Sequence, residues 1–207
     1  MLKYVLISVL ALGVIGGVAG LFHLYRVSAR NEKEMSLYST GNVTVNKNLG
    51  KVLVVYYSMG GNTRDIAQRI QAQTGCDVYE IKTAEEIKKN LLLYLKIKRD
   101  LKKGTYPALQ GDMPDMDKYD IVFVGSPVWW YTVSTPVRAF LSKADFNGKK
   151  VVPFTTQGSN VGTFLEDFDE MAKNANVIRY LAFNNMGKEY DKAVDNKISV
   201  WLNGLAP

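Results

Sequence analysis

The sequence predicts an α/β fold, a doubly wound five-stranded parallel sheet with helices on both faces, behind an N-terminal transmembrane helix. Two observations predict it. From Lys51 onward, short apolar runs alternate with longer amphipathic runs, as in chains that alternate strands with helices. Before that point, Tyr4–Tyr25 carries no Asp, Glu, Lys or Arg. Because ligands of parallel sheets bind beyond the carboxyl ends of the strands, function is expected in the loops there.

The N-terminal segment is long enough to cross a bilayer. As a helix, Tyr4–Tyr25 covers about 33 Å, against about 30 Å of hydrocarbon. A cleaved export signal, with small residues at 18–20, is the alternative, but the apolar run continues past that point and favours a retained anchor. The segment that follows is polar, with few large apolar side chains to pack. We therefore divide the chain into an anchor or signal peptide (1–27), a polar linker (28–48) and an α/β domain (49–207).

The expected strands are short runs rich in β-branched and aromatic residues. Lys51–Ser58 contains Val-Leu-Val-Val-Tyr-Tyr and stops before Met-Gly-Gly-Asn, and Asp120–Pro127 contains Ile-Val-Phe-Val. The other three runs are also mainly apolar, and turn-forming residues lie near their ends. The expected strands are residues 51–58, 77–83, 120–127, 150–157 and 176–184.

The expected helices fill the intervals after these strands, with apolar residues at helical spacing. The Lys-rich stretch Lys88–Lys103 is interpreted as an amphipathic helix with a solvated basic face; contact with a membrane surface is the second interpretation. A later helix has a clear start, with Thr135 as N-cap and Pro136 at the first helical position. The expected helices are residues 63–74, 85–103, 135–144, 162–174 and 188–204.

Composition excludes several classes of function. Residues 1–50 carry five Lys/Arg and two Asp/Glu, and residues 51–207 carry twenty-one and eighteen, so each part has a net charge of +3. No stretch interleaves clustered Lys/Arg with aromatic residues, so no nucleic-acid partner is expected. The only histidine, His23, lies in the anchor, and Cys76 is the only cysteine. We predict no catalytic Ser-His-Asp or Cys-His system and no metal site, so any chemistry has to come from a cofactor.

A small loop leads from the first strand into the first helix: Ser58, Met59, Gly60, Gly61, Asn62 and Thr63. The first N–H groups of a helix have no partner inside it and lie at the positive end of its dipole, so such a loop can bind phosphate. The two hydroxyls would add donors, and the glycines would let a ligand approach the backbone. An ordinary strand-to-helix turn is the alternative. Neither the NTPase loop nor the dinucleotide-binding glycine pattern is present.

Two more loops are expected at the same edge of the sheet. Beyond the third strand, Trp129, Trp130 and Tyr131 stand in a loop, where one periodic element cannot bury three large rings. A flat aromatic ligand would give them a stacking partner worth about 0.5–1.5 kcal/mol. The alternative is that the rings cap the sheet edge and pack on the helix over 85–103. Beyond the fourth strand lies Thr155–Gly162, made mostly of hydroxyl, amide and glycine residues.

The segments YYSMGGNTRDIA, FVGSPVWWYTVSTPVRAFL and VVPFTTQGSNVGTFLEDF resemble, in the same order, the three cofactor loops of flavodoxin-like proteins. The resemblance implies strand order 2-1-3-4-5 and FMN bound without a covalent link. The chain differs from the best-known flavodoxins in having Gly60 where they carry a third hydroxyl. The implied phosphate contacts are Ser58, Met59, Gly60, Gly61, Asn62 and Thr63, and the implied ring contacts are Pro127, Val128, Trp129, Trp130, Tyr131, Thr156, Gln157, Gly158, Ser159 and Asn160.

The resemblance leaves three classes of function. The first is a carrier that transfers electrons between FMN and a redox partner protein or a small-molecule electron acceptor. The second is an FMN-dependent NAD(P)H oxidoreductase of the quinone reductase type, which needs an open pocket over the flavin; the adjacent aromatics favour a covered ring. The third is a flavin-free interaction module.

The charges that flank the anchor predict a single-pass membrane protein with its flavin domain on the cytoplasmic side. Lys3 precedes the apolar run, whereas Arg26, Arg30 and Lys33 follow it closely. Orientation follows the bias in Lys and Arg near the membrane. A domain on the extracellular side is the alternative.

Overall fold

The computed structural model describes residues 2–90, 92–185 and 187–205. The order in the main sheet is β2-β1-β5-β7-β8, with β9 also pairing with β7, and these pairs are parallel. Counted by the expected strands, this is the predicted order 2-1-3-4-5. The strands are β1 (Val52–Tyr56), β2 (Asp77–Glu80), β5 (Ile121–Trp129), β7 (Lys150–Gln157), β8 (Asn176–Val177) and β9 (Leu181–Asn184).

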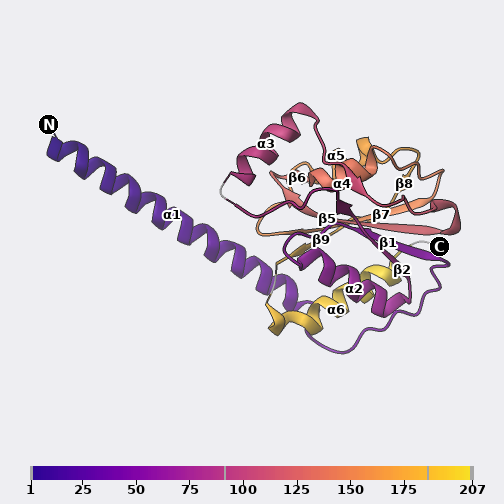
Figure 1. Cartoon of the computed structure of the whole chain (residues 1–207). Helices are drawn as coiled ribbons and strands as arrows, with labels where there is room; N and C mark the ends of the chain where they lie inside the picture. Colours follow the sequence, from indigo (N-terminus) through magenta and orange to yellow (C-terminus); the bar gives the residue numbers. More distant parts are fainter. Residues whose placement is uncertain (1, 91, 186, 206–207) are drawn as a thin grey trace.

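Helices cover both faces of this sheet (Figure 1). One face carries α2 (Asn62–Thr74) and α6 (Asp191–Asn203); the other carries α3 (Leu93–Lys103), α4 (Thr135–Leu141) and α5 (Phe164–Met171). Each face has its own buried cluster, with Phe140, Phe164 and Phe168 in one and Ile66, Ile70 and Trp201 in the other. The short elements are β3 (Lys82–Thr83), β4 (Leu109–Gln110), η1 (Met116–Lys118), β6 (Thr132–Val133) and η2 (Lys188–Tyr190).

The helix expected over 85–103 was wrong in its first part, because α3 begins at Leu93 and the described residues 84–90 are irregular. The backbone there bonds across the chain instead: β3 pairs with β4, and the N–H of Ala84 donates to the carbonyl of Ala108 at 2.8 Å. These bonds hold the chain before residue 85 in an extended pairing, and the Oδ1 of Asn90 accepts from the N–H of Leu93 at 2.9 Å, where α3 begins.

Other boundaries also differ from the prediction: the strand expected over 77–83 is divided into β2 and β3, and the helices expected over 135–144 and 162–174 are the shorter α4 and α5. The N-cap of α4 is Ser134 rather than Thr135, and Thr135 is the first helical residue. The last expected strand is divided into β8 and β9, with Arg179 between them at φ 40. A positive φ interrupts the extended backbone that a continuous strand needs.

The N-terminal residues form one long helix, α1 (Leu2–Ser36), which projects away from the domain (Figure 1). Within the described ranges, α1 is the one helix long and apolar enough to cross a membrane, over Leu10–Ser36, and its apolar window is not buried in the structure. The helix has no break at residue 27, where the anchor was expected to end. The boundaries 1–27, 28–48 and 49–207 stay a prediction.

The segment expected to be a linker, residues 28–48, packs on the domain. Met35 is 3% exposed, and Glu34 pairs with the buried Lys197 of α6, with 2.6 Å between Oε1 and Nζ. Burial lowers the pKa of Lys197, and the Glu34 carboxylate opposes that shift. The amide of Asn196 bonds to the backbone of the segment at three points. The segment is therefore packed on the domain and is not a free linker. The sequence did not predict this packing, because polar side chains make most of the contacts.

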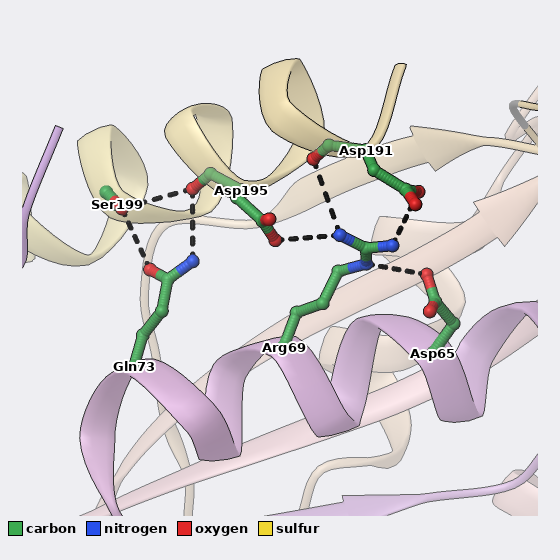
Figure 2. Close-up of polar contacts among 6 residues, drawn as sticks. All are labelled: Asp65, Arg69, Gln73, Asp191, Asp195 and Ser199. Carbon is green, nitrogen blue, oxygen red and sulfur yellow. Dashed lines mark hydrogen bonds and ion pairs between the residues drawn. The ribbon is translucent and has the colours of Figure 1, made fainter. Parts of the chain in front are cut away.

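Arg69 joins α2 to α6 (Figure 2). Its guanidinium donates to the carboxylates of Asp65 at 2.8 Å, Asp191 at 2.6 Å and Asp195 at 2.8 Å. The Arg69 side chain is 17% exposed, so these bonds are better shielded from water than those of a surface pair. The contact fixes α6, and with it the segment that follows α1.

We expect Arg69→Leu to lower the free energy of unfolding by about 1–3 kcal/mol, because charge-assisted hydrogen bonds are lost and three carboxylates are left close together. Chemical denaturation followed by tryptophan fluorescence measures this. Lys96→Leu is the control: it forms a single i,i+4 pair on α3, with Asp100 at 2.5 Å, and its own side chain is 63% exposed, so a change of about 0.5 kcal/mol is expected. Equal effects of the two variants would show that Arg69 does not hold the helices together.

Candidate functional site

A cavity of about 480 Å³ opens beyond the carboxyl ends of β1, β5 and β7. The three loops that the sequence singled out meet there, and all the predicted binding residues except Gly61 line it: Ser58, Met59, Gly60, Asn62, Thr63, Pro127, Val128, Trp129, Trp130, Tyr131, Thr156, Gln157, Gly158, Ser159 and Asn160. Five lining residues were missed by sequence reasoning: Lys89, Leu93, Tyr94, Ile97 and Asn185. Four of these lie in or just before α3, whose distance along the chain from the three loops hides the contact.

The loop between β1 and α2 has the features of an anion site. The Oγ of Ser58 accepts a hydrogen bond from the N–H of Gly61 at 3.1 Å. Gly61 itself has φ 93, a left-handed conformation that glycine adopts readily. The first bond into α2 runs from the N–H of Asp65 to the carbonyl of Gly61 at 2.9 Å. The N–H groups before it have no acceptor inside the helix and lie at its positive end. Gly61 thus shapes the loop without lining the cavity.

Thr63 and Thr156 tie the first loop to the third. Their hydroxyls are 2.8 Å apart, and the residues are 1% and 4% exposed. One hydroxyl donates this bond and the other accepts it. The donating hydroxyl can still accept another hydrogen bond, and the accepting hydroxyl can still donate one. This bond fixes the start of α2 against the end of β7.

A strained hairpin forms the second wall. β5 extends through Trp129 and pairs antiparallel with β6, which leaves Trp130 and Tyr131 as a two-residue turn with φ 51 and 65. A turn with positive φ at both positions is typically Asn-Gly or Gly-Gly, because a side chain there costs about 1–2 kcal/mol per residue. The sequence predicted a loop here, and the strand is longer than expected. Strain of this kind is concentrated at functional sites.

The three adjacent aromatics have three environments. Trp129 is 9% exposed and meets Tyr57 edge-on, with ring centroids 5.6 Å apart, and burial raises the pKa of Tyr57 to about 12. Trp130 is 39% exposed; its Nε1 donates to the carbonyl of Tyr94 at 2.8 Å, so this ring packs on α3. Tyr131 is 57% exposed. The prediction that the three rings cannot all be buried is confirmed.

A carboxylate of α5 holds the hairpin in place. The Oδ2 of Asp167 lies 3.0 Å from the guanidinium of Arg138 and accepts hydrogen bonds from the hydroxyls of Thr163 (2.8 Å) and Thr132. The Nε of Arg138 also donates to the carbonyl of Val133 at 3.1 Å. These bonds offset the strain of the turn, because they fix β6 from both sides.

The third loop contacts the hairpin through its backbone. The N–H of Thr163 donates to the carbonyl of Tyr131 at 2.8 Å, and Gly162, at φ 60, passes so close that a Cβ would meet that carbonyl oxygen at 2.2 Å. In the same loop the Oε1 of Gln157 is buried and has no hydrogen-bond partner within the described residues. A buried acceptor without a partner is costly, so this oxygen is suited to a donor from a ligand.

Arg30 of α1 reaches the rim of the cavity. Its guanidinium donates to the carbonyl of Ser159 at 2.6 Å. Sequence reasoning assigned Arg30 to the linker and missed this contact, since no local pattern marks a pairing of residues 129 positions apart. The C-terminal part of α1 and the candidate site are therefore in direct contact.

Solved structures described as flavoproteins are similar to this chain. The chain is similar to a flavoprotein from Lactobacillus acidophilus NCFM crystallised in complex with FMN, with 28% identity, a TM-score of 0.59, and coverage of 64% of this chain and 93% of that one. The solution structure of the apo-form of the flavoprotein from the same organism matches at 28% identity and a TM-score of 0.53, over 71% and 99% of the two chains. A flavoprotein from Bacteroides eggerthii matches at 25% identity and a TM-score of 0.61, over 74% and 96%.

A search of curated proteins gave no match. The sequence profile of a family described as flavodoxin, however, matches residues 51–202, which include every strand of the main sheet and all three loops of the cavity. The profile match, the sheet order and the position of the cavity agree with one another. The chain therefore belongs to the flavodoxin family.

Proposed function

We propose that the cavity binds FMN without a covalent link and that the protein is a membrane-anchored electron-transfer flavoprotein. One observation carries the proposal: the loop at the start of α2, which has the features of an anion site, and the aromatic wall line the same cavity of about 480 Å³. This volume lies within the range of about 300–1,000 Å³ that is typical of pockets for small molecules and cofactors. The Lactobacillus relative, crystallised with FMN, supports the same cofactor here.

The residues present fit this cofactor. The hydroxyl of Ser58 and the first N–H groups of α2 would hold the phosphate, and the space where Gly60 would carry a Cβ is open. The unpartnered Oε1 of Gln157 would accept from an N–H at the edge of the ring. When bound, FMN supplies transfer of one or two electrons.

The chain's own part is to orient the cofactor and to limit access to it. Trp129 is locked by its contact with Tyr57, and Trp130 is fixed on α3, so two rings of this wall cannot move freely. Tyr131, which is more than half exposed, stands on the same wall and can meet a partner. A redox partner protein or a small-molecule electron acceptor is the proposed recipient of the electrons.

The absorption spectrum of the purified full chain tests the proposal. A flavin spectrum, or its appearance with near-stoichiometric added FMN, is expected. A folded protein that stays colourless in excess FMN would instead be a flavin-free interaction module. Addition of NADH or NADPH then separates the two redox classes: a carrier keeps its colour until a reductase is added, whereas direct bleaching would identify an NAD(P)H oxidoreductase.

Gly61→Ala is expected to weaken FMN binding by about 5- to 30-fold. The residue has φ 93, and a side chain in that conformation costs about 1–2 kcal/mol. If the free loop relaxes out of this conformation, that energy must be supplied again on binding. Gly104→Ala is the matched control: φ is +63, the space around its Cβ position is open, and it caps the far end of α3. Similar FMN affinities in the two variants would argue against the loop as the phosphate site.

We also propose that α1 is retained as an anchor and that the flavin domain lies on the cytoplasmic side. Support comes from the length of the apolar helix and from Arg26, Arg30 and Lys33 on its domain side. Protease added to intact cells is expected to leave the domain uncut. Digestion without lysis would place the domain outside, and recovery of a soluble chain that begins near Leu21 would show a cleaved signal.

A further inference from the structure

The contact between α1 and the cavity rim fixes how far the cavity lies from the membrane. Arg30, which bonds to Ser159 of the rim, lies five residues beyond Tyr25, the last residue of the uncharged run. That is about 8 Å along a helix. The headgroup layer on each side of a bilayer is about 5–8 Å thick. If Tyr4–Tyr25 spans the bilayer, the Ser159 edge of the cavity lies at the outer edge of the lipid headgroups.

The domain is held at this distance by further contacts of α1. Met35 is buried in the core, and Glu34 pairs with Lys197 at 2.6 Å. Lys197 in turn donates to the carbonyl of Ala182, in β9, at 2.6 Å. Because these contacts lie within two turns of Arg30, the end of α1 cannot swing away from the domain without breaking them. The direction of α1 therefore sets which side of the domain faces the bilayer.

The exposed side of α3 is apolar next to the cavity. Leu93, Tyr94 and Ile97 line the cavity; Leu93 and Ile97 are buried, and Tyr94 is 53% exposed. The neighbouring Leu92 and Leu95 are 70% and 65% exposed. Three large exposed apolar residues in four positions are unusual for a surface in contact with water only. Figure 1 shows the N-terminal end of α3 on the left of the domain, the side from which α1 projects.

Basic residues continue this exposed side. Residues 85–103 hold seven Lys/Arg and three Asp/Glu. One of these acids, Asp100, pairs with Lys96 at 2.5 Å and more distantly with Arg99 at 3.9 Å. Arg99 and Lys102 are exposed and follow Leu95 at helical spacing. A helix with apolar side chains beside cations is typical of segments that lie in the interface of an anionic bilayer.

We propose that the face of α3 formed by Leu92, Leu95, Arg99 and Lys102, the α3 face, lies on an anionic membrane surface, with Tyr94 between this face and the cavity. The mouth of the cavity then opens at the lipid headgroups, and the electron partner of the flavin is held in or on the membrane. The proposal rests on α1 as a membrane anchor. The proposal favours contact of Lys88–Lys103 with a membrane surface over the solvated basic face that was the first interpretation of the sequence.

The depth of the α3 face in a bilayer tests this. The full chain with Leu95→Cys, labelled with an environment-sensitive fluorophore, is reconstituted into phosphatidylcholine vesicles that contain phosphatidylglycerol and a lipid with a nitroxide near its headgroup. Most of the fluorescence is expected to be lost. Val78→Cys is the control, because Val78 is exposed on the edge strand β2 and does not line the cavity; little quenching is expected. The buried Cys76 is replaced by Ser in both.

Charge gives a second, independent measurement. Arg99→Glu with Lys102→Glu is expected to reduce the quenching at position 95, and so is removal of phosphatidylglycerol, whereas Lys118→Glu with Lys143→Glu, in exposed segments outside the α3 face, should change it little. Equal quenching at positions 95 and 78, or none at 95, would overturn the proposal while α1 stays inserted. Release of the chain from the vesicles by alkaline carbonate would overturn the anchor itself, which keeps the two failures distinct.

Discussion

Gly162→Ala is expected to lower the free energy of unfolding by about 2–5 kcal/mol and to remove most FMN binding. Gly162 has φ +60, where a side chain costs about 1–2 kcal/mol. A Cβ there would also lie 2.2 Å from the carbonyl oxygen of Tyr131 and 2.3 Å from its Cβ, an overlap that costs about a further 1–3 kcal/mol. Relief of the overlap moves the third loop away from the hairpin and breaks the bond from the N–H of Thr163 to Tyr131. Both walls of the cavity then shift.

Chemical denaturation and FMN titration measure the two effects, and Gly148→Ala separates their causes. Gly148 has φ +76, but no atom lies within 4 Å of its Cβ position. Gly148→Ala is therefore expected to lower the free energy of unfolding only by the cost of a side chain at positive φ, about 1–2 kcal/mol, and to leave FMN binding unchanged. If both variants lose the same stability and both bind FMN normally, the loops are not in tight contact at Gly162.

The order of the sheet could be predicted because it depends on local patterns repeated along the chain. Each apolar run and each amphipathic run is visible within about ten residues, and parallel connection follows from their alternation. The first part of the helix expected over 85–103 could not be predicted. Just before it, Ala84 bonds to Ala108 across the chain, and the side chain of Asn90 accepts from the N–H of Leu93, so tertiary contacts place the start of the helix later than the local spacing indicates.

The candidate site divides in the same way. Its three loops lie at the ends of strands, so sequence and topology together place them at one edge. Lys89 and Tyr94 line the cavity and Arg30 bonds to its rim, but they come from segments whose local pattern indicates only a helix or a linker. Their role depends on tertiary packing that no spacing in the sequence records.

The aromatic residues show how far composition alone can lead. Three adjacent large rings predict that at least one is exposed, and Tyr131 is. The sequence does not distinguish Trp129, which packs on Tyr57, from Trp130, which packs on α3. The difference arises from the positive φ of the two turn residues, a conformation that Trp and Tyr rarely adopt and that their sequence therefore does not predict.

Ser58→Ala is expected to weaken FMN binding by about 10- to 150-fold and riboflavin binding little. The Oγ of Ser58 already accepts a bond from the N–H of Gly61 at 3.1 Å, so its hydrogen is available to a phosphate oxygen. A bond of this kind to a charged group contributes about 1.5–3 kcal/mol, which corresponds to that change in affinity. Riboflavin has no phosphate and loses no such bond. Fluorescence titration of both ligands gives the ratio.

Ser142→Ala is the matched control for this ratio, because among the described residues its hydroxyl bonds to the carbonyl of Ala139 alone, at the end of α4 and outside the cavity. It should leave both affinities unchanged. Thr63 is a poorer choice for the test, since its hydroxyl is bonded to Thr156, and its loss would also loosen the third loop and weaken both ligands. A selective loss for FMN in Ser58→Ala would therefore identify the phosphate site, whereas equal losses for FMN and riboflavin would show that Ser58 only shapes the loop through Gly61.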